Sequence, residues 1–194
     1  MTGMRRRAIL LDRDGTLCEE VGYVNHVGRV RIPERSIEAV RRANEAGFQT
    51  VLVTNQAGVA RGYFDEALVG EVHDHIREAL GARGARLDGI YYCPHHPEAG
   101  SGPYRRECDC RKPGTGMLLR ARDEMGIDLE ASYMVGDSHK DIEAGHGVGA
   151  KTVLVLTGYG RGELEHQPHR FRNEPDHVAA DLLEAVEWIL ETSS

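Results

Sequence analysis

Two aspartates, Asp12 and Asp14, stand two positions apart in the segment LDRDGTL, directly after the apolar run AILL. Residues two positions apart on a strand share a face, so both carboxylates can lie at one pocket at the end of the strand. Gly15 gives the backbone the freedom for the sharp turn that we expect after Asp12. At average residue frequencies the pattern D-x-D-G-T arises roughly once in 10⁵ starting positions. The segment therefore indicates a functional pair of carboxylates and not a chance pairing.

A carboxylate pair of this kind suits phosphoryl transfer. One carboxylate can attack phosphorus to give an aspartyl phosphate, which divides one difficult hydrolysis into two easier steps. The other carboxyl group can protonate the leaving oxygen and later deprotonate the attacking water. Because two anions next to a phosphate repel it, a cation is required. Mg²⁺ fits, since it is a hard ion that needs few protein oxygens besides phosphate and water.

Other polar residues follow other apolar runs of the chain. Thr54 ends the run FQTVLVT and Asn55 follows it, Lys112 follows the run GIYYC after a loop, and Asp137 follows the run SYMVG. Asp137 is the obvious further Mg²⁺ ligand, Lys112 is a point charge suited to phosphoryl oxygens, and Thr54 offers a hydroxyl donor. We expect these side chains and the aspartate pair to meet at one site.

Three cysteines and one histidine gather in a second segment, as Cys93-Pro-His95 and Cys108-Asp-Cys110. Zn²⁺ prefers a tetrahedral set of thiolates and imidazoles, and four protein ligands with no open position are typical of a structural site. The spacings C-x-H and C-x-C are tighter than those of common zinc fingers, so chance clustering is the alternative. The remaining cysteine, Cys18, is expected to be a buried apolar residue.

Short apolar runs alternate with helical patterns, which predicts a parallel sheet covered on both faces and thus a doubly wound α/β fold. The predicted strands are 8–12, 48–54, 89–93, 132–136 and 151–156. The predicted helices are 36–46 (with Ser36 as N-cap), 65–80, 116–124, 138–146 and 181–190. Such sheets bind ligands at the carboxyl ends of their strands. The candidate residues lie at the ends of these predicted strands or, for Lys112, after the loop that follows one of them.

Length and composition bound the remaining possibilities. The chain has 194 residues, 40% of them hydrophobic and 28% charged, which predicts one domain spanning residues 1–194. Its net charge of −7 argues against a nucleic-acid partner. The start MTGMRRRAILLD has too short an apolar run for a signal peptide, and no stretch reaches transmembrane length. We expect a cytoplasmic protein with no membrane partner.

The motifs together resemble those of the haloacid dehalogenase (HAD) superfamily of phosphatases over nearly the whole chain. DRDGT resembles its first motif, TNQ its second, the lysine of CRKP its third and GDSHKD its fourth. The resemblance implies that Asp12 is the nucleophile, Asp14 is the acid/base, and Thr54 and Lys112 stabilise the phosphoryl group. It also implies that Mg²⁺ is held by Asp12, by the backbone carbonyl of Asp14 and by Asp137. Asp141 would orient its neighbours by hydrogen bonds.

CPHHP followed by CDCRKP is similar to the zinc loop of one branch of this superfamily, which has no separate cap domain. That branch contains phosphatases of heptose bisphosphate and of histidinol phosphate. VGYVNH, TNQAGVARGYF, LDGIYYCPHHP and ASYMVGD are more similar to the heptose phosphatases. This implies removal of the 7-phosphate of D-glycero-D-manno-heptose 1,7-bisphosphate, in nucleotide-activated heptose biosynthesis. The alternatives are a histidinol-phosphate phosphatase and a non-catalytic, zinc-containing binding protein.

In such a capless enzyme, specificity for a phosphorylated sugar would lie in the loops around the site. The guanidinium of Arg111 has the planar fork needed to bind the sugar or a distal phosphate, whereas Ser138 stands where some heptose phosphatases have lysine. We expect a monomer, because no exposed amphipathic seam is evident. The predicted substrate-binding residues are Glu20, Val21, Gly22, Tyr23, Asn55, Gln56, Ala57, Arg61, Arg111 and Ser138.

Overall fold

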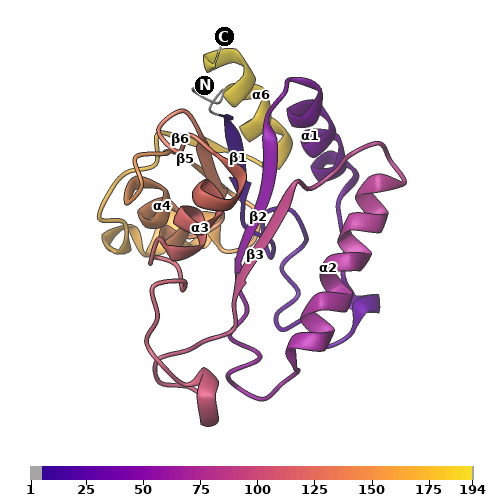
Figure 1. Cartoon of the computed structure of the whole chain (residues 1–194). Helices are drawn as coiled ribbons and strands as arrows, with labels where there is room; N and C mark the ends of the chain where they lie inside the picture. The colour runs from indigo at the N-terminus through magenta and orange to yellow at the C-terminus, as the bar shows by residue number, and fades with distance from the viewer. Residues whose placement is uncertain (1–5, 194) are drawn as a thin grey trace.

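A parallel sheet with helices on both faces forms the framework of the chain (Figure 1). The computed structural model describes residues 6–193, so the first five residues of the arginine-containing start lie outside the described residues. The strands are β1 (Ala8–Leu11), β2 (Gln49–Asn55), β3 (Gly89–Cys93), β4 (Tyr133–Gly136), β5 (Lys151–Val155) and β6 (His177–Ala179). Their order across the sheet is β3-β2-β1-β4-β5-β6, and every pairing is parallel. The predicted doubly wound α/β fold is confirmed.

Alternation along β1 shows how the two hydrophobic cores form. Ile9 and Leu11 point into one core, which α1, α2 and α6 close, while Ala8 and Leu10 point into the other core, against α3 and α4. All four side chains are fully buried or nearly so, as expected for a central parallel strand. The helices are α1 (Glu34–Glu45), α2 (Glu66–Gly81), α3 (Gly116–Met125), α4 (His139–His146), α5 (Gly160–His166) and α6 (Leu182–Thr192).

Helix boundaries follow from local capping residues. Asp65 caps α2, accepting a hydrogen bond of 3.0 Å from the backbone N–H of Leu68, and Gly126, with φ of 69°, ends α3. The prediction that Ser36 is an N-cap is wrong. Pro33, with φ of −60°, starts α1 two residues earlier than predicted, so Ser36 lies buried in the first turn of the helix.

Two elements were not predicted from the sequence, and both lie near the C-terminal end of the chain. In α5 the buried residues are Gly160 and Glu163, so the helix shows no apolar periodicity. Strand β6 has only three residues and lies at the edge of the sheet. Such short elements carry too few apolar side chains to stand out in a sequence pattern.

The polar candidates lie at one end of the sheet, where the strands deliver long loops instead of a separate cap. Segment 12–33 follows β1 and contains a single 3₁₀ turn, Val27–Arg29. Segment 94–115 follows β3 and contains another, Gly102–Tyr104, and it forms the long excursion at the bottom of Figure 1. Among the helices of residues 6–193, none combines the length and apolarity needed to cross a membrane.

Candidate active site

The candidate residues meet where the winding of the sheet reverses. Strands β1 and β4 are neighbours although they are distant in sequence, and the backbone N–H of Asp12 donates to the carbonyl of Val135 at 3.0 Å. Asp12 therefore leaves β1 next to Asp137, which leaves β4. In doubly wound sheets this reversal point is where ligands bind. A cavity of about 730 Å³ lies there, lined by residues of both loops.

The ammonium of Lys112 bridges Asp12, which follows β1, and Asp141, which lies on α4. Its Nζ donates to Asp12 Oδ1 at 2.7 Å, to Asp141 Oδ1 at 2.5 Å and to the carbonyl of Val53 at 2.8 Å. Asn55 fixes its backbone in both directions, since Asn55 Nδ2 donates to the Lys112 carbonyl and Asn55 Oδ1 accepts from the Lys112 N–H, each at 3.0 Å. Lys112 is buried, so its ammonium has a fixed position.

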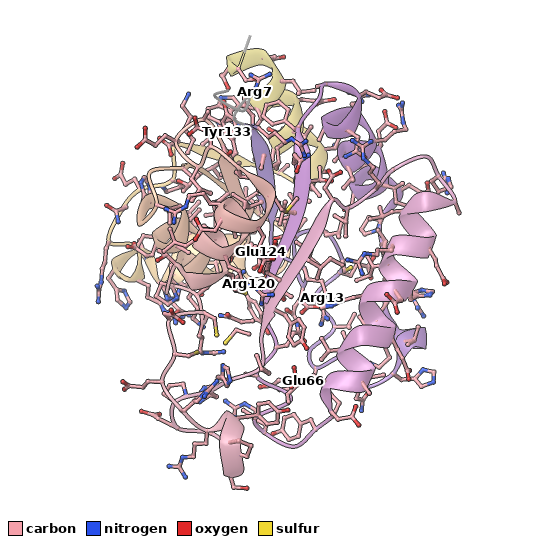
Figure 2. The ribbon with its side chains drawn as sticks, in the orientation of Figure 1. Arg7, Arg13, Glu66, Arg120, Glu124 and Tyr133 are labelled. Carbon is pink, nitrogen blue, oxygen red and sulfur yellow. The ribbon has the colours of Figure 1, made fainter. Side chains whose placement is uncertain are left out.

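Asp14 is turned toward a second group of side chains on the other side of the DxD turn. Arg13 grips both of its carboxylate oxygens, with Nε 3.1 Å from Oδ1 and Nη2 2.9 Å from Oδ2. Gln56 Nε2 donates to Asp14 Oδ2 at 3.0 Å and to Thr54 Oγ1 at 2.9 Å, and Gln56 Oε1 accepts from Arg13 at 2.9 Å. Figure 2 labels Arg13 between the sheet and α2.

The loop after β5, which contains Thr157, Gly158 and Tyr159, packs against Asp137. The backbone N–H of Tyr159 donates to Asp137 Oδ2 at 2.8 Å, and Thr157 Oγ1 donates to the carbonyl of Gly15 at 2.6 Å. A Cβ at Gly158 would lie 2.0 Å from Asp137 Oδ2, and one at Gly15 would lie 2.1 Å from the same oxygen. Both glycines have positive φ, 52° and 84°. Only glycine fits this close approach of two loops to one carboxylate.

Three carboxylates crowd the floor of the cavity. Oxygens of Asp12, Asp137 and Asp141 all lie within 4.8 Å of one another. Burial, reinforced by the neighbouring carboxylates and opposed by Lys112, raises the pKa of Asp12 to about 7. Burial and the charges of Asp12 and Asp141 raise the pKa of Asp137 to about 9. Burial alone would lower the pKa of Lys112, but Asp12 and Asp141 together outweigh it and raise that pKa.

This crowding fits a site for a hard cation. One lysine does not balance three buried carboxylates, and a divalent cation would relieve both their desolvation and their repulsion. Asp141 uses one oxygen for Lys112, and the other accepts from the Ser138 backbone N–H at 3.1 Å and from Ser138 Oγ at 2.9 Å. The predicted orienting role of Asp141 is compatible with these bonds, and Asp12 and Asp137 keep oxygens that a cation can bind.

The predicted cysteine and histidine cluster also comes together. The Sγ atom of Cys110 lies 3.1 Å from that of Cys93 and 3.2 Å from that of Cys108, and His95 Nδ1 lies 3.4 Å from it. A tetrahedral site with Zn–S of 2.3 Å and Zn–N of 2.0–2.1 Å has S–S edges of about 3.8 Å and S–N edges of about 3.5 Å, whereas a disulfide needs an S–S distance of about 2.05 Å. The sulfurs are too far apart for disulfides, and all four ligand atoms lie within 4.8 Å of one another, so small shifts would let one metal ion contact all four.

The cluster lies directly behind the catalytic lysine candidate. Arg111 and Lys112 follow Cys110 without a break, and Arg111 Nη1 donates to the carbonyl of His95 at 3.2 Å. On the far side of the loop, Tyr92 and Tyr104 donate to the two oxygens of Glu66 at 2.5 and 2.6 Å. Glu66, labelled in Figure 2, joins the start of α2 to this loop. A metal in the cluster would hold the segment that delivers Arg111 and Lys112.

Most of the predicted substrate-binding residues line the cavity, but two do not. Val21 packs against the hydrophobic core below the loop, and the exposed Arg61 lies 3.5 Å from His96 Nε2. The residues that line the cavity are Glu20, Gly22, Tyr23, Asn55, Gln56, Ala57, Arg111 and Ser138.

Among these lining residues, several have side chains that are already engaged with the protein. Gln56 and Asn55 hold Asp14 and Lys112, and Ser138 bonds Asp141. Glu20 Oε1 accepts from the Gly22 N–H at 2.6 Å, and burial raises the pKa of Glu20.

Sequence reasoning missed some residues of the site. Arg13 was not selected, although a charged residue between two aspartates is a signal that points to it. The TGY segment after β5 could have been found by applying the strand-end rule to the last predicted strand. Lys140 and Arg170 also line the cavity. Nothing in the sequence indicates Arg170, because it lies on the 3₁₀ turn Pro168–Arg170 that follows the unpredicted helix α5.

Comparisons with known proteins agree with this geometry. A HAD-hydrolase-like family model matches residues 109–185. D-glycero-β-D-manno-heptose-1,7-bisphosphate 7-phosphatase of Pasteurella multocida is 50% identical over 154 residues, which are 79% of this chain and 83% of the relative. The phosphatase of that name from Photorhabdus laumondii is 46% identical over 184 residues, 94% of this chain and 96% of the relative.

A solved structure extends the likeness to three dimensions. The crystal structure of D,D-heptose 1,7-bisphosphate phosphatase from B. bronchiseptica, complexed with magnesium and phosphate, superposes with a TM-score of 0.84 at 34% identity. The match covers 96% of this chain and 99% of that one. The sheet order and the polar side chains at its carboxyl edge are those of a HAD-like hydrolase. Within that class, the chain belongs to the family of D-glycero-β-D-manno-heptose-1,7-bisphosphate 7-phosphatases.

Proposed function

We propose that this chain hydrolyses the 7-phosphate of D-glycero-D-manno-heptose 1,7-bisphosphate, with Asp12 as the nucleophile. The observation that carries the proposal is the meeting of Asp12, Asp137 and Lys112 at one buried point of the cavity. The relatives reported above carry the name of this activity over most of their length. These relatives do not favour histidinol phosphate as the substrate. A non-catalytic binding protein would not need a carboxylate nucleophile, a further metal ligand and a lysine at one point.

The chain's own residues divide the reaction into two displacements. In the first, an oxygen of Asp12 forms a bond to phosphorus while the bond from phosphorus to the sugar oxygen breaks, and Asp14 gives that oxygen a proton. In the second, Asp14 takes a proton from water, whose oxygen attacks phosphorus and displaces Asp12. Inorganic phosphate leaves and both aspartates are restored. Lys112 and the Thr54 hydroxyl stabilise the phosphoryl oxygens during both steps.

Two metal ions belong to the proposal. Asp12, Asp137 and the backbone carbonyl of Asp14 would hold Mg²⁺, which supplies positive charge next to the phosphoryl oxygens. Zn²⁺ would occupy the cluster of Cys93, His95, Cys108 and Cys110 in a structural role, supported by the spacing of the four ligand atoms. All catalytic groups and both metal sites lie on one sheet and its loops, so we propose that the chain works as a single domain.

Replacing the nucleophile tests the proposal. Asp12→Asn keeps the size of the side chain but removes the charged oxygen that must bond phosphorus, so phosphate release from heptose 1,7-bisphosphate should fall on the order of 10⁴-fold or more. Asp74→Asn is a matched control, because the Asp74 side chain is 73% exposed on α2. Near-normal turnover by Asp12→Asn would refute the assigned nucleophile. A higher kcat/KM for histidinol phosphate than for the bisphosphate would refute the assigned substrate.

A further inference from the structure

The cavity has a second polar end that the proposed chemistry does not use. Arg111, Lys140 and Arg170 line it, from the loop before Lys112, from α4 and from the 3₁₀ turn after α5. These segments are separate in sequence, yet each places a cation at the cavity. The chain as a whole has a net charge of −7, so this concentration of positive charge is local.

Lys140 is the cation of this group that lacks a protein partner. It is half-buried, and no hydrogen bond or ion pair joins its ammonium to any of residues 6–193. Burial lowers the pKa of Lys140, and the charges of Arg111 and Arg170 lower it further. The ammonium is therefore partly removed from water while it faces two like charges.

The carboxylate of Glu163 acts on Lys140 but cannot fully compensate its charge. Glu163 Oε2 accepts from the His139 backbone N–H at 2.7 Å and lies 2.9 Å from His139 Nδ1, and Glu163 Oε1 accepts from Arg170 at 3.2 Å. The hydroxyl of Ser138, which precedes these residues, is bonded to Asp141. Lys140, Arg170 and the remaining N–H groups of Arg111 therefore still have donors to offer at this end of the cavity.

We propose that Lys140 and Arg170 bind the second, non-reacting phosphate of the substrate and thereby set the preference for a bisphosphate. The inference rests on the proposed function, since it assumes that the reacting phosphate lies at Asp12. Like charges brought together inside a cavity repel one another, and a dianionic group between them turns that repulsion into attraction. A neutral sugar hydroxyl offers no such compensation, so the cations match a phosphate better than they match the ring.

The test compares the heptose 1,7-bisphosphate with the same heptose carrying only the 7-phosphate. For Lys140→Gln and for Arg170→Gln, the ratio of kcat/KM for the bisphosphate to that for the monophosphate should fall about 10- to 100-fold, as for loss of a hydrogen bond to a charged group. The loss should appear mainly in KM for the bisphosphate. Lys140→Arg should restore most of the ratio, because it keeps the charge at the same place.

Arg161→Gln is the matched control, since Arg161 lies on α5, is 63% exposed and pairs with Glu165 of the same helix. If wild type prefers the bisphosphate and Lys140→Gln and Arg170→Gln keep that preference, the subsite is refuted and the proposed function stands. Equal losses for the two substrates would also refute the subsite, because they would point to general attraction of phosphate. If wild type shows no preference for the bisphosphate over the monophosphate, the subsite is refuted, and the proposed function fails only if the 7-phosphate of the bisphosphate is not hydrolysed.

Discussion

At the scale of single residues, the site depends on side chains that hold the proposed catalytic groups as much as on those groups themselves. Asp14 is held by Arg13 through two parallel hydrogen bonds, and Gln56 joins this pair to Thr54. Arg13 is buried, so its planar guanidinium has one orientation. A fork of this kind fixes both the position and the plane of a carboxylate.

Arg13→Lys tests this holding role. Lysine keeps the positive charge, but its single ammonium cannot reproduce the planar fork that bonds both Asp14 oxygens and Gln56 Oε1. Asp14 should therefore lose its fixed orientation. We expect kcat to fall about 10-fold or more, a part of the usual contribution of general acid–base catalysis, with little change in KM. Arg120→Lys is the control, because Arg120 also pairs with a carboxylate, that of Glu124, but on an exposed helix face (Figure 2). Equal kcat values for the two variants would contradict the role.

The motif residues could be predicted at this scale, but their partners could not. Asp12, Lys112 and Asp137 were selected because phosphoryl transfer needs their chemistry at the strand ends, and the structure brings the three side chains together. Substrate binding by Asn55 and Gln56 stays a prediction, and the structure adds their bonds to Lys112 and Asp14. Which of several polar groups an amide reaches depends on distances between loops, and those distances are not encoded in local spacing.

At the scale of elements, the loop after β5 positions the floor of the cavity. Gly158 touches both Asp137 and the DxD turn, and no side chain fits between them. The Tyr159 N–H donates a hydrogen bond to Asp137, and the Thr157 hydroxyl donates one to the carbonyl of Gly15 in the DxD turn. An outer group that orients a metal ligand typically contributes 10- to 100-fold to metal affinity. If Asp137 binds Mg²⁺ as proposed, the loop should therefore affect magnesium affinity through its contacts with Asp137.

Gly158→Ala should raise the Mg²⁺ concentration needed for half-maximal activity about 10-fold or more, because the new methyl group must displace Asp137. Gly70→Ala is the matched control, since Gly70 lies on α2 away from the cavity, and among residues 6–193 no atom outside that helix lies within 4 Å of a Cβ at that position. Magnesium titrations of both variants, with thermal unfolding as a check on folding, measure the difference. An unchanged magnesium requirement in a folded Gly158→Ala protein would show that Asp137 does not depend on this loop.

Elements were predictable in proportion to the apolar side chains they bury. Strands β1, β2, β4 and β5 bury most of their residues, and their apolar runs were found. Helix α5 and strand β6 bury few, and both were missed. The cationic end of the cavity includes Arg170, which follows α5, so the missed helix also concealed part of the proposed substrate subsite.

At the scale of the whole molecule, the order of the strands brings the site together. The sequence predicts strands and helices but not that β4 lies next to β1, and that adjacency places Asp137 beside Asp12. The winding reverses there, so loops from both halves of the sheet open away from each other and leave a cavity. Three carboxylates then share a small buried volume, an arrangement that destabilises the fold without a cation.

Magnesium should therefore stabilise the whole chain against unfolding. A ligand at 100 times its Kd contributes about 2.7 kcal/mol, and 1 kcal/mol shifts Tm by about 2–4 °C in a chain of this size, so a rise of roughly 5 to 11 °C is expected. Thermal unfolding is measured in buffer prepared with and without MgCl₂ at equal ionic strength. No chelator is used, because a chelator would also strip a metal from the cysteine and histidine cluster.

Asp137→Asn separates this effect from general salt stabilisation. The variant loses a proposed ligand, so its Tm should hardly respond to Mg²⁺. Without Mg²⁺ it should unfold at a temperature equal to or above that of wild type, because one of three mutually repelling carboxylates is gone. Stabilisation of wild type and variant to the same extent would mean that Mg²⁺ acts elsewhere on the surface, and the three carboxylates would then need another explanation.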